Sequence, residues 1–269
     1  MKVKRDMKTI FKIFWISTIS TIVNILTKIL VDDNFLAFLA LDNPKLEKFH
    51  IEYIIINFVV FTILTIVFIY GKRYIPTSKL TKGVFYSLSI SLIWFALKFE
   101  PSKSESFLNY LLSIITFFIP MMIYGIFLGY LSSEKSFTYK LSEGFLASFI
   151  YLSSWVLLRV LYINIGVDRG LFHIFSGALW LVIAGTVIGV IFGLIFDMSY
   201  GDKKETLIWI LLVAVITFSG YYLLEYTLDK FFNPYRFIAV GLDVLAIIIS
   251  TLLSFKIFAK NGPGKQGIK

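Results

Sequence analysis

Charged side chains within long apolar runs are the residues of this sequence most suited to chemistry. Arg159 lies in one such run, and Asp243 lies in another, nearer the carboxyl end. A charged residue at the centre of a membrane helix costs about 2.5 to 3.5 kcal/mol on insertion scales, so each needs a partner or a function. At about 1.5 Å per helical residue, both lie roughly 9 to 10 Å below the same membrane surface. We therefore predict that their helices are neighbours and that Arg159 and Asp243 form an ion pair.

Two interpretations of this pair are open. In the first, the ion pair only fixes the register of two helices. In the second, it belongs to an outward-facing polar site with three basic and two acidic residues, and therefore with a mild preference for anionic ligands. The residues of this candidate site are Arg159, Asp243, Glu225, Lys98 and Lys28.

Glycines at every fourth position indicate tight helix packing in two apolar runs. These glycines are Gly125, Gly129, Gly185, Gly189 and Gly193. Small residues at this spacing make a groove in which another helix lies close, either within the chain or between copies of it. Proline bends a helix, so Pro120, just before the first pair, is a candidate hinge.

Motifs of the common enzyme classes are missing. The patterns G-x-S-x-G, H-E-x-x-H and G-x-x-x-x-G-K-[ST] do not occur. The chain has no cysteine, and its two histidines, His50 and His173, are too few for most zinc sites or for paired haem ligands. Asp197 and Asp243 are expected at opposite ends of their helices, which excludes an aspartyl dyad. We expect no enzymatic activity, no metal and no cofactor.

Helices that cross a membrane must position these residues. Of 269 residues, 58% are hydrophobic and 16% are charged, and the mean hydropathy is +0.82, unlike a soluble domain. Apolar runs long enough to cross roughly 30 Å of hydrocarbon recur eight times, and the alternation typical of barrel strands does not appear. We predict an all-α, polytopic transmembrane bundle that forms one domain. Its spans are expected near residues 9–31, 53–70, 83–98, 107–131, 144–165, 172–196, 206–226 and 236–258.

The distribution of lysine and arginine predicts the orientation of this bundle. Of the 26 basic residues, 16 lie on the side that carries both termini, 6 lie on the other side and 4 lie within spans. The positive-inside rule therefore places both termini in the cytoplasm of a multi-pass cell-membrane protein. A dispersed basic rim suits anionic lipid headgroups better than nucleic acid, so we expect the bilayer as a partner and no nucleic acid.

The spans pair into four helical hairpins with a shared local pattern. In each odd-numbered span, a polar or aromatic residue precedes a charged residue by four positions. The four pairs are Asn24–Lys28, Trp94–Lys98, Trp155–Arg159 and Tyr221–Glu225. One explanation is a set of parallel repeats, as in some carriers. The other is the general preference of aromatic and long basic side chains for membrane interfaces.

Three classes of function are consistent with these observations. The leading hypothesis is a transporter-like protein that translocates or senses a small or lipidic solute, with an anion favoured by the charges. The second is a non-catalytic subunit or assembly factor that forms homo- or hetero-oligomers through its glycine faces. The third is a membrane-embedded lipid-processing enzyme. A water-accessible cavity at Arg159 and Asp243 would favour the first, and a glycine groove that faces lipid would favour the second.

Overall fold

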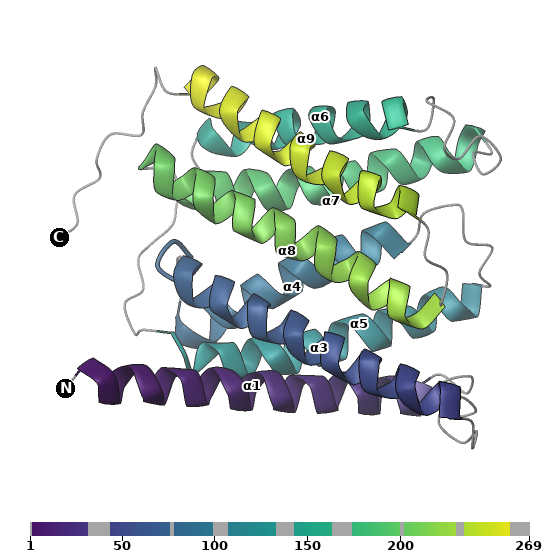
Figure 1. The fold of residues 1–269 in the computed structure, drawn as a ribbon. Helices are drawn as coiled ribbons and strands as arrows, with labels where there is room; N and C mark the ends of the chain where they lie inside the picture. Colours follow the sequence, from purple (N-terminus) through teal and green to yellow (C-terminus); the bar gives the residue numbers. More distant parts are fainter. Residues whose placement is uncertain are drawn as a thin grey trace.

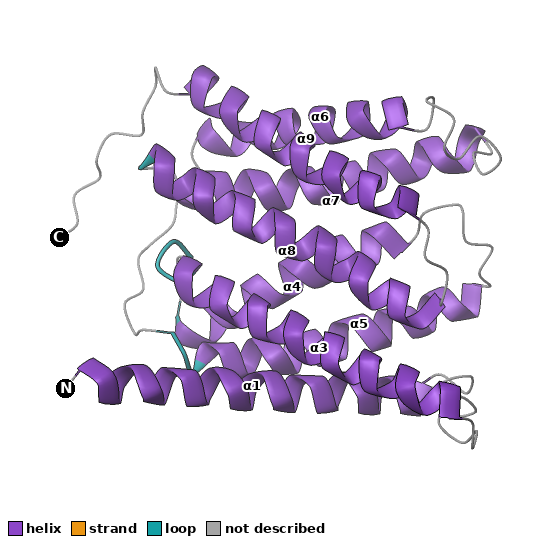
Figure 2. Cartoon of the chain, viewed as in Figure 1, coloured by secondary structure: helices purple, strands orange, loops and turns teal. Residues whose placement is uncertain are grey.

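The described part of the chain consists of helices and short connecting turns, without strands (Figure 2). A computed structural model describes residues 2–31, 44–75, 78–98, 107–132, 143–162, 174–199, 202–229 and 234–258, and the side chains of some residues at the ends of these segments are outside the description. The helices are α1 (Lys2–Val31), α3 (Pro44–Gly71), α4 (Lys79–Lys98), α5 (Phe107–Gly129), the short 3₁₀ helix η1 (Glu143–Leu146), α6 (Ala147–Tyr162), α7 (Ile174–Ser199), α8 (Lys203–Asp229) and α9 (Pro234–Phe258).

The all-helical membrane bundle predicted from the sequence is confirmed. Among the described residues, six helices contain stretches long and apolar enough to cross a membrane: α1, α3, α4, α7, α8 and α9. In α5 and α6 the described apolar stretches are shorter, at Phe118–Gly129 and Ala147–Tyr162. The count of eight crossings therefore stays a prediction, although every expected span coincides with a helix.

The helices pair as four antiparallel hairpins: α1 with α3, α4 with α5, α6 with α7, and α8 with α9. In Figure 1, α1 begins and α9 ends on the left side of the bundle. We call this side the terminal end, and the side where α1 ends and α9 begins the opposite end.

The four hairpins assemble into two halves. In the first half, α1 joins the hairpins through its contact with α5, and in the second half α6 joins them through its contact with α9. The halves meet where α3 packs on α8, α4 packs on α7, and α4 packs on α8. These contacts connect the eight described α-helices in a closed ring, with α4 and α8 adjacent across its centre (Figure 1).

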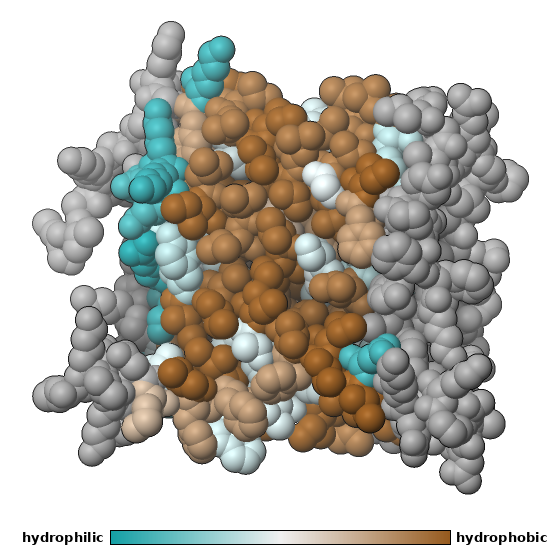
Figure 3. Space-filling view, in the orientation of Figure 1, coloured by the Kyte–Doolittle hydropathy of each residue, from teal (hydrophilic) through white to brown (hydrophobic). Residues whose placement is uncertain are grey.

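The surface of the bundle suits a bilayer. Apolar residues cover the middle of the face in Figure 3, and hydrophilic residues gather where α3 ends and α8 begins. Many large apolar side chains are exposed on the outside of the ring, while buried aromatic side chains fill its interior. Because lipid is as apolar as these side chains, their exposure is compatible with a membrane and not with water.

Glycines allow close approach of the helices within two hairpins. A Cβ atom added to Gly129 would lie 2.9 Å from the Cα atom of Leu80, so α5 packs backbone to backbone on α4. A Cβ atom at Gly189 would lie 2.7 Å from the carbonyl oxygen of Ser148, and one at Gly193 would lie 2.8 Å from its Cα atom, so α7 packs equally closely on α6. Both glycine faces are therefore occupied by the neighbouring helix of the same hairpin, and an oligomer would have to use another surface.

Candidate functional site

The structure joins Arg159 of α6 to Asp243 of α9. Arg159 Nε donates a hydrogen bond to Asp243 Oδ1 at 2.8 Å, and its Nη2 donates one to Asp243 Oδ2 at 2.6 Å. This bidentate geometry matches the planar fork of the guanidinium to the two carboxylate oxygens. The side chains are 2% and 1% exposed, so the pair lies in the interior of the second half.

Three aromatic side chains surround this ion pair. Trp155, one helical turn before Arg159, donates from its indole nitrogen to Asp243 Oδ1 at 2.8 Å, and Tyr222 of α8 accepts from Arg159 Nη2 at 2.8 Å. The guanidinium carbon lies 5.4 Å from the ring centre of Trp155 and 5.9 Å from that of Trp180, within the range of cation–π attraction. The arrangement fixes α6 against α9, as the first interpretation of the pair requires.

The lysines of the predicted site lie elsewhere, in the first half. Lys28 and Lys98 are half-buried side chains near the opposite end of the bundle, where α1 and α4 end. Both line a partly open cavity between α1, α3, α4, α5 and α8, which we call the lysine cavity. Its lining residues are Asn24, Lys28, Phe61, Trp94, Lys98, Thr116, Pro120, Met121, Tyr221 and Leu224. Neither Arg159 nor Asp243 is among them, so the structure does not unite the predicted residues in one site.

Local packing holds the walls of the lysine cavity. Asn24 Nδ2 donates to Asn57 Oδ1 at 2.5 Å, which ties α1 to α3. The Lys28 ammonium lies 5.4 Å from the ring centre of Tyr53, so this lysine contacts α3. Trp94 of α4 donates from its indole nitrogen to the carbonyl oxygen of Thr217 at 2.7 Å, which fixes α4 against α8. The cations are therefore carried by helices that are joined through buried hydrogen bonds.

The electrostatics of the lysine cavity favour an anion. Two lysines and no carboxylate are among its described lining residues, and Asn24, Thr116 and Tyr221 add neutral polar groups. The space available to the centres of water-sized groups is about 40 Å³. Roughly 10 to 15 Å³ is enough for one water molecule, so the cavity has room for a few waters or a small oxyanion.

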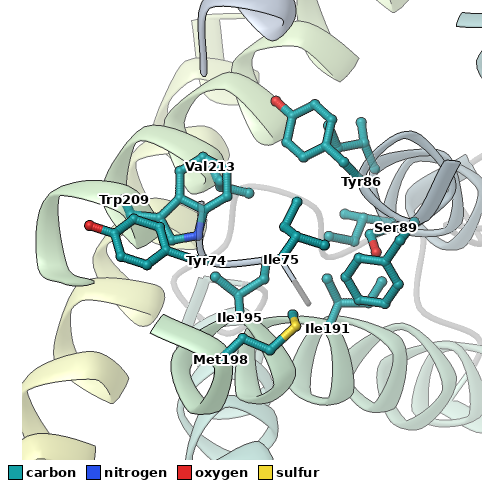
Figure 4. A pocket seen from close by; sticks show the side chains of 12 residues that line it. Tyr74, Ile75, Tyr86, Ser89, Ile191, Ile195, Met198, Trp209 and Val213 are labelled. Atoms are coloured by element: carbon teal, nitrogen blue, oxygen red, sulfur yellow. The ribbon is translucent and has the colours of Figure 1, made fainter. Parts of the chain in front are cut away.

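A second cavity lies nearer the terminal end and is apolar. Figure 4 shows it between α4, α7, α8 and the turn after α3, with Tyr74, Ile75, Ile195 and Trp209 in its wall. It offers only about 10 Å³ to the centres of water-sized groups. Because this volume holds at most one water and the wall is almost entirely apolar, we regard this cavity as a packing gap.

A surface cluster beside this gap joins the turn after α3 to α8. The Tyr74 hydroxyl donates to Glu205 Oε2 at 2.8 Å, and Arg73 Nη2 lies 2.9 Å from the same oxygen. Burial, followed by the hydrogen bond to Glu205, raises the pKa of Tyr74 to about 12. Tyr74 therefore stays a neutral donor at physiological pH, and the cluster acts as a connection between helices.

The remaining predicted residues have mixed outcomes. The side chains of Glu225 and His50 and the whole of His173 lie outside the described residues. Pro120 is buried in α5 and lines the lysine cavity, while its role as a hinge stays a prediction. Among the described residues, no group of His, Cys, Asp and Glu is arranged to hold a metal ion.

Sequence reasoning missed two residues of these sites. Tyr222 contacts the ion pair and Thr116 lines the lysine cavity, and neither stands out among the many tyrosines and threonines of the spans. For Thr116, one signal was present: it precedes Pro120 by four residues, and proline has no N–H to donate to the carbonyl group at that position.

Comparison with known proteins adds no family to this geometry. No family model matches the chain, and no curated protein and no solved structure is significantly similar to it.

Proposed function

We propose that this multi-pass membrane protein binds an anionic solute in the lysine cavity and carries it across the bilayer without an enzymatic step. The observation that carries the proposal is the presence of Lys28 and Lys98 in one partly open cavity of a transmembrane bundle. Charged residues at membrane depth are costly, and those that line a cavity typically mark the path of a solute or an ion.

Two features of the fold support translocation as the role of this site. Pro120 lies in the cavity wall, and a proline within a helix is a common point of bending. The two halves are joined by α3, α4, α7 and α8, and carriers built from parallel repeats place their solute between repeats. Movement of one half against the other would change access to a cavity that α8 shares with the first half.

The basic residues and the glycine contacts bear on the membrane orientation of the bundle and on the alternative role as an assembly subunit. We propose that the terminal end faces the cytoplasm, because the sequence places 16 of its 26 basic residues on that side. The lysine cavity then opens toward the outer leaflet. Assembly through the glycine faces has less support, since α4 and α6 already occupy them.

A flux measurement tests the proposal directly. Purified protein is reconstituted into phosphatidylcholine vesicles in two arms: one follows radiolabelled inorganic phosphate, and the other follows a fluorescent phosphatidylglycerol through its accessibility to dithionite. We expect a flux above that of protein-free vesicles in one arm. The double variant Lys28→Gln/Lys98→Gln should reduce it to the protein-free level, because the cavity loses both cations.

A matched control uses a lysine far from the cavity. Lys256 is exposed near the end of α9, so Lys256→Gln removes a positive charge without touching the cavity and should keep the flux of the unmodified protein. Absence of flux in both arms, or a flux that the double variant retains, would contradict the proposal.

A further inference from the structure

The inward face of α1 is polar, whereas its outward face is apolar. Large apolar side chains are exposed on the outside of this helix, among them Phe11, Trp15, Ile22 and Leu26. The buried residues among its described side chains are Ile16, Ser17, Ser20, Thr21, Asn24 and Thr27. All of these except Ile16 are polar. Polar groups that a membrane helix turns away from lipid need polar partners or water.

Three buried hydroxyls of this face have no hydrogen-bond partner in the part of the chain that the structure describes. They belong to Ser17, Ser20 and Thr21, which are 0%, 0% and 4% exposed, and we call these residues the hydroxyl face. Residues three and four positions apart lie on the same side of a helix, so the three hydroxyls are neighbours. No other helix within the described ranges has three unpartnered hydroxyls in one turn.

These hydroxyls indicate a polar occupant. A buried hydroxyl without a partner is unfavourable in an apolar interior, and helical serine and threonine often avoid this by donating to the carbonyl group four residues earlier. Thr27 donates to Val23 in this way at 2.8 Å, but the hydroxyl face does not. Its hydroxyls therefore remain available to water or to a solute, each as a donor and as an acceptor.

The hydroxyl face continues the wall of the lysine cavity. Asn24 and Lys28 line that cavity, and Asn24 lies three residues beyond Thr21 on the same side of α1. At about 1.5 Å per residue, Lys28 and Ser17 are roughly 16 Å apart along the helix axis, about half of a hydrocarbon core of roughly 30 Å. The polar face of α1 thus extends from the cavity to about the middle of the bundle.

The neighbouring helices α3 and α5 add polar groups at the depth of Ser17. The antiparallel helices α1 and α3 are joined where Asn24 bonds to Asn57. Counted from this bond toward the terminal end, Ser17 lies seven residues along α1 and Thr65 lies eight residues along α3, so their depths are similar. The Thr65 hydroxyl lies 3.0 Å from the Tyr124 hydroxyl of α5. Hydroxyl groups from all three helices therefore lie in one layer of the bundle.

We propose that the hydroxyl face of α1 lines the route of the solute between the lysine cavity and the terminal end, and that this route is closed in the present structure. Hydroxyl groups donate to an anion and replace part of its hydration shell, so they suit the anionic solute proposed for the cavity. The burial of all three hydroxyls corresponds to the closed state. This inference rests on the proposed translocation, and it adds the path that the solute takes.

The packing of α1 indicates how the route opens. This helix lies at the edge of the bundle, where it packs on α3 and α5 (Figure 1). In its apolar stretch 28% of the residues are buried, the smallest share among the six described stretches of membrane length. The contacts of Asn24 with Asn57 and of Lys28 with Tyr53 both lie toward the opposite end. An outward tilt of α1 at the terminal end would therefore expose the hydroxyl face and keep these contacts.

Cysteine accessibility tests this route, because the sequence has no cysteine of its own. The single variants Ser17→Cys, Ser20→Cys and Thr21→Cys keep the approximate size of each side chain. Each protein is reconstituted into the vesicles of the flux assay and treated with the anionic reagent 2-sulfonatoethyl methanethiosulfonate, and the modified fraction is followed by mass spectrometry. The matched controls are Ile22→Cys and Leu26→Cys, on the exposed apolar side of the same helix.

We expect the cysteines of the hydroxyl face to react about tenfold faster than the control cysteines, because the reactive thiolate forms in contact with water and not in apolar surroundings. Modification should also reduce the flux toward the protein-free level in whichever arm, inorganic phosphate or phosphatidylglycerol, the unmodified protein transports. Equal rates at the face and the control positions would overturn the inference and leave the face as a packing surface. Modification without loss of flux would also overturn it.

Removal of the hydroxyls provides a second test that needs no reagent. The triple variant Ser17→Ala/Ser20→Ala/Thr21→Val should lose most of the flux, while its free energy of unfolding stays unchanged or rises, because no hydrogen bond of the closed state is lost. The control Thr18→Val removes a hydroxyl that donates to the carbonyl group of Phe14, and it should keep the flux. An unchanged flux in the triple variant would overturn the inference.

The route and the translocation itself can fail separately. Absence of flux in the unmodified protein contradicts translocation and, with it, the route. A flux that depends on Lys28 and Lys98 but persists in the triple variant contradicts the route alone.

Discussion

At the scale of single residues, the Arg159–Asp243 pair makes a strong prediction about stability. Arg159→Leu leaves the Asp243 carboxylate buried without its cation. Removing one member of a buried ion pair typically costs about 3 to 5 kcal/mol. We expect a loss of this size in the free energy of unfolding, measured by denaturation with sodium dodecyl sulfate in mixed micelles.

The double variant Arg159→Leu/Asp243→Leu separates pairing from packing. Because it removes both charges, no buried ion is left alone, and replacement of a buried pair by apolar residues is often close to neutral. We expect the double variant to be more stable than Arg159→Leu alone. Equal or greater loss in the double variant would show that the two charges do not compensate one another.

The sequence predicts how deep Arg159 and Asp243 lie along their helices, but it does not predict which neighbouring helix each side chain faces. Counting from the ends of the spans placed Arg159 and Asp243 at equal depth, and opposite charges at equal depth in a membrane are expected to pair. The same count could not separate them from Lys28 and Lys98, because depth does not identify the neighbouring helix. Which side chains share a cavity depends on how every helix is turned against its neighbours, and that is decided by packing.

At the scale of helices, the packing of α6 on α7 depends on Gly193. A Cβ atom there would lie 2.8 Å from both the backbone nitrogen and the Cα atom of Ser148, which cannot move as a flexible side chain does. Overpacking of this kind typically costs about 1 to 3 kcal/mol. We therefore expect Gly193→Ala to lower the free energy of unfolding by this amount in the same denaturation assay.

Gly241 provides the matched control for this substitution. It lies in α9, and a Cβ atom added to it would meet nothing within 4 Å. Because alanine favours a helix by up to about 1 kcal/mol relative to glycine, Gly241→Ala should be neutral or stabilising. If both variants lost stability equally, the close approach of α6 and α7 would not be the reason for the glycine at position 193.

Helix ends and helix faces show what the apolar pattern can predict. The pattern placed the second span at residue 53, whereas α3 begins at Pro44, because hydropathy detects the part of a helix that suits lipid and not its polar first turns. The glycine spacing predicted close helix contact at Gly125 and Gly189. It could not distinguish a neighbour in the same chain from a second copy, since both would need the same groove.

At the scale of the whole molecule, similar local patterns take part in different interactions in the two halves. The aromatic or polar residue four positions before a charge recurs in α1, α4, α6 and α8, and among the described residues Arg159 of α6 forms a buried bidentate ion pair with Asp243. The second half is therefore fixed by an internal ion pair, whereas the helices of the first half contribute most of the walls of the lysine cavity.

The arrangement of four hairpins predicts that both ends of the chain lie on one side of the membrane. The sequence has no cysteine, so single cysteines can be introduced without a background. Met7 and Lys256 are exposed near the terminal end, and Glu52 is exposed near the opposite end, in the first turn of the apolar part of α3. A membrane-impermeant maleimide should label Glu52→Cys in intact cells, and it should label Met7→Cys and Lys256→Cys only after permeabilisation, because the basic side is expected in the cytoplasm. Labelling of Met7→Cys and Lys256→Cys from different sides of the membrane would contradict an even number of crossings. Labelling of both variants from outside the cell would agree with four hairpins but would reverse the orientation. The lysine cavity would then open toward the cytoplasm.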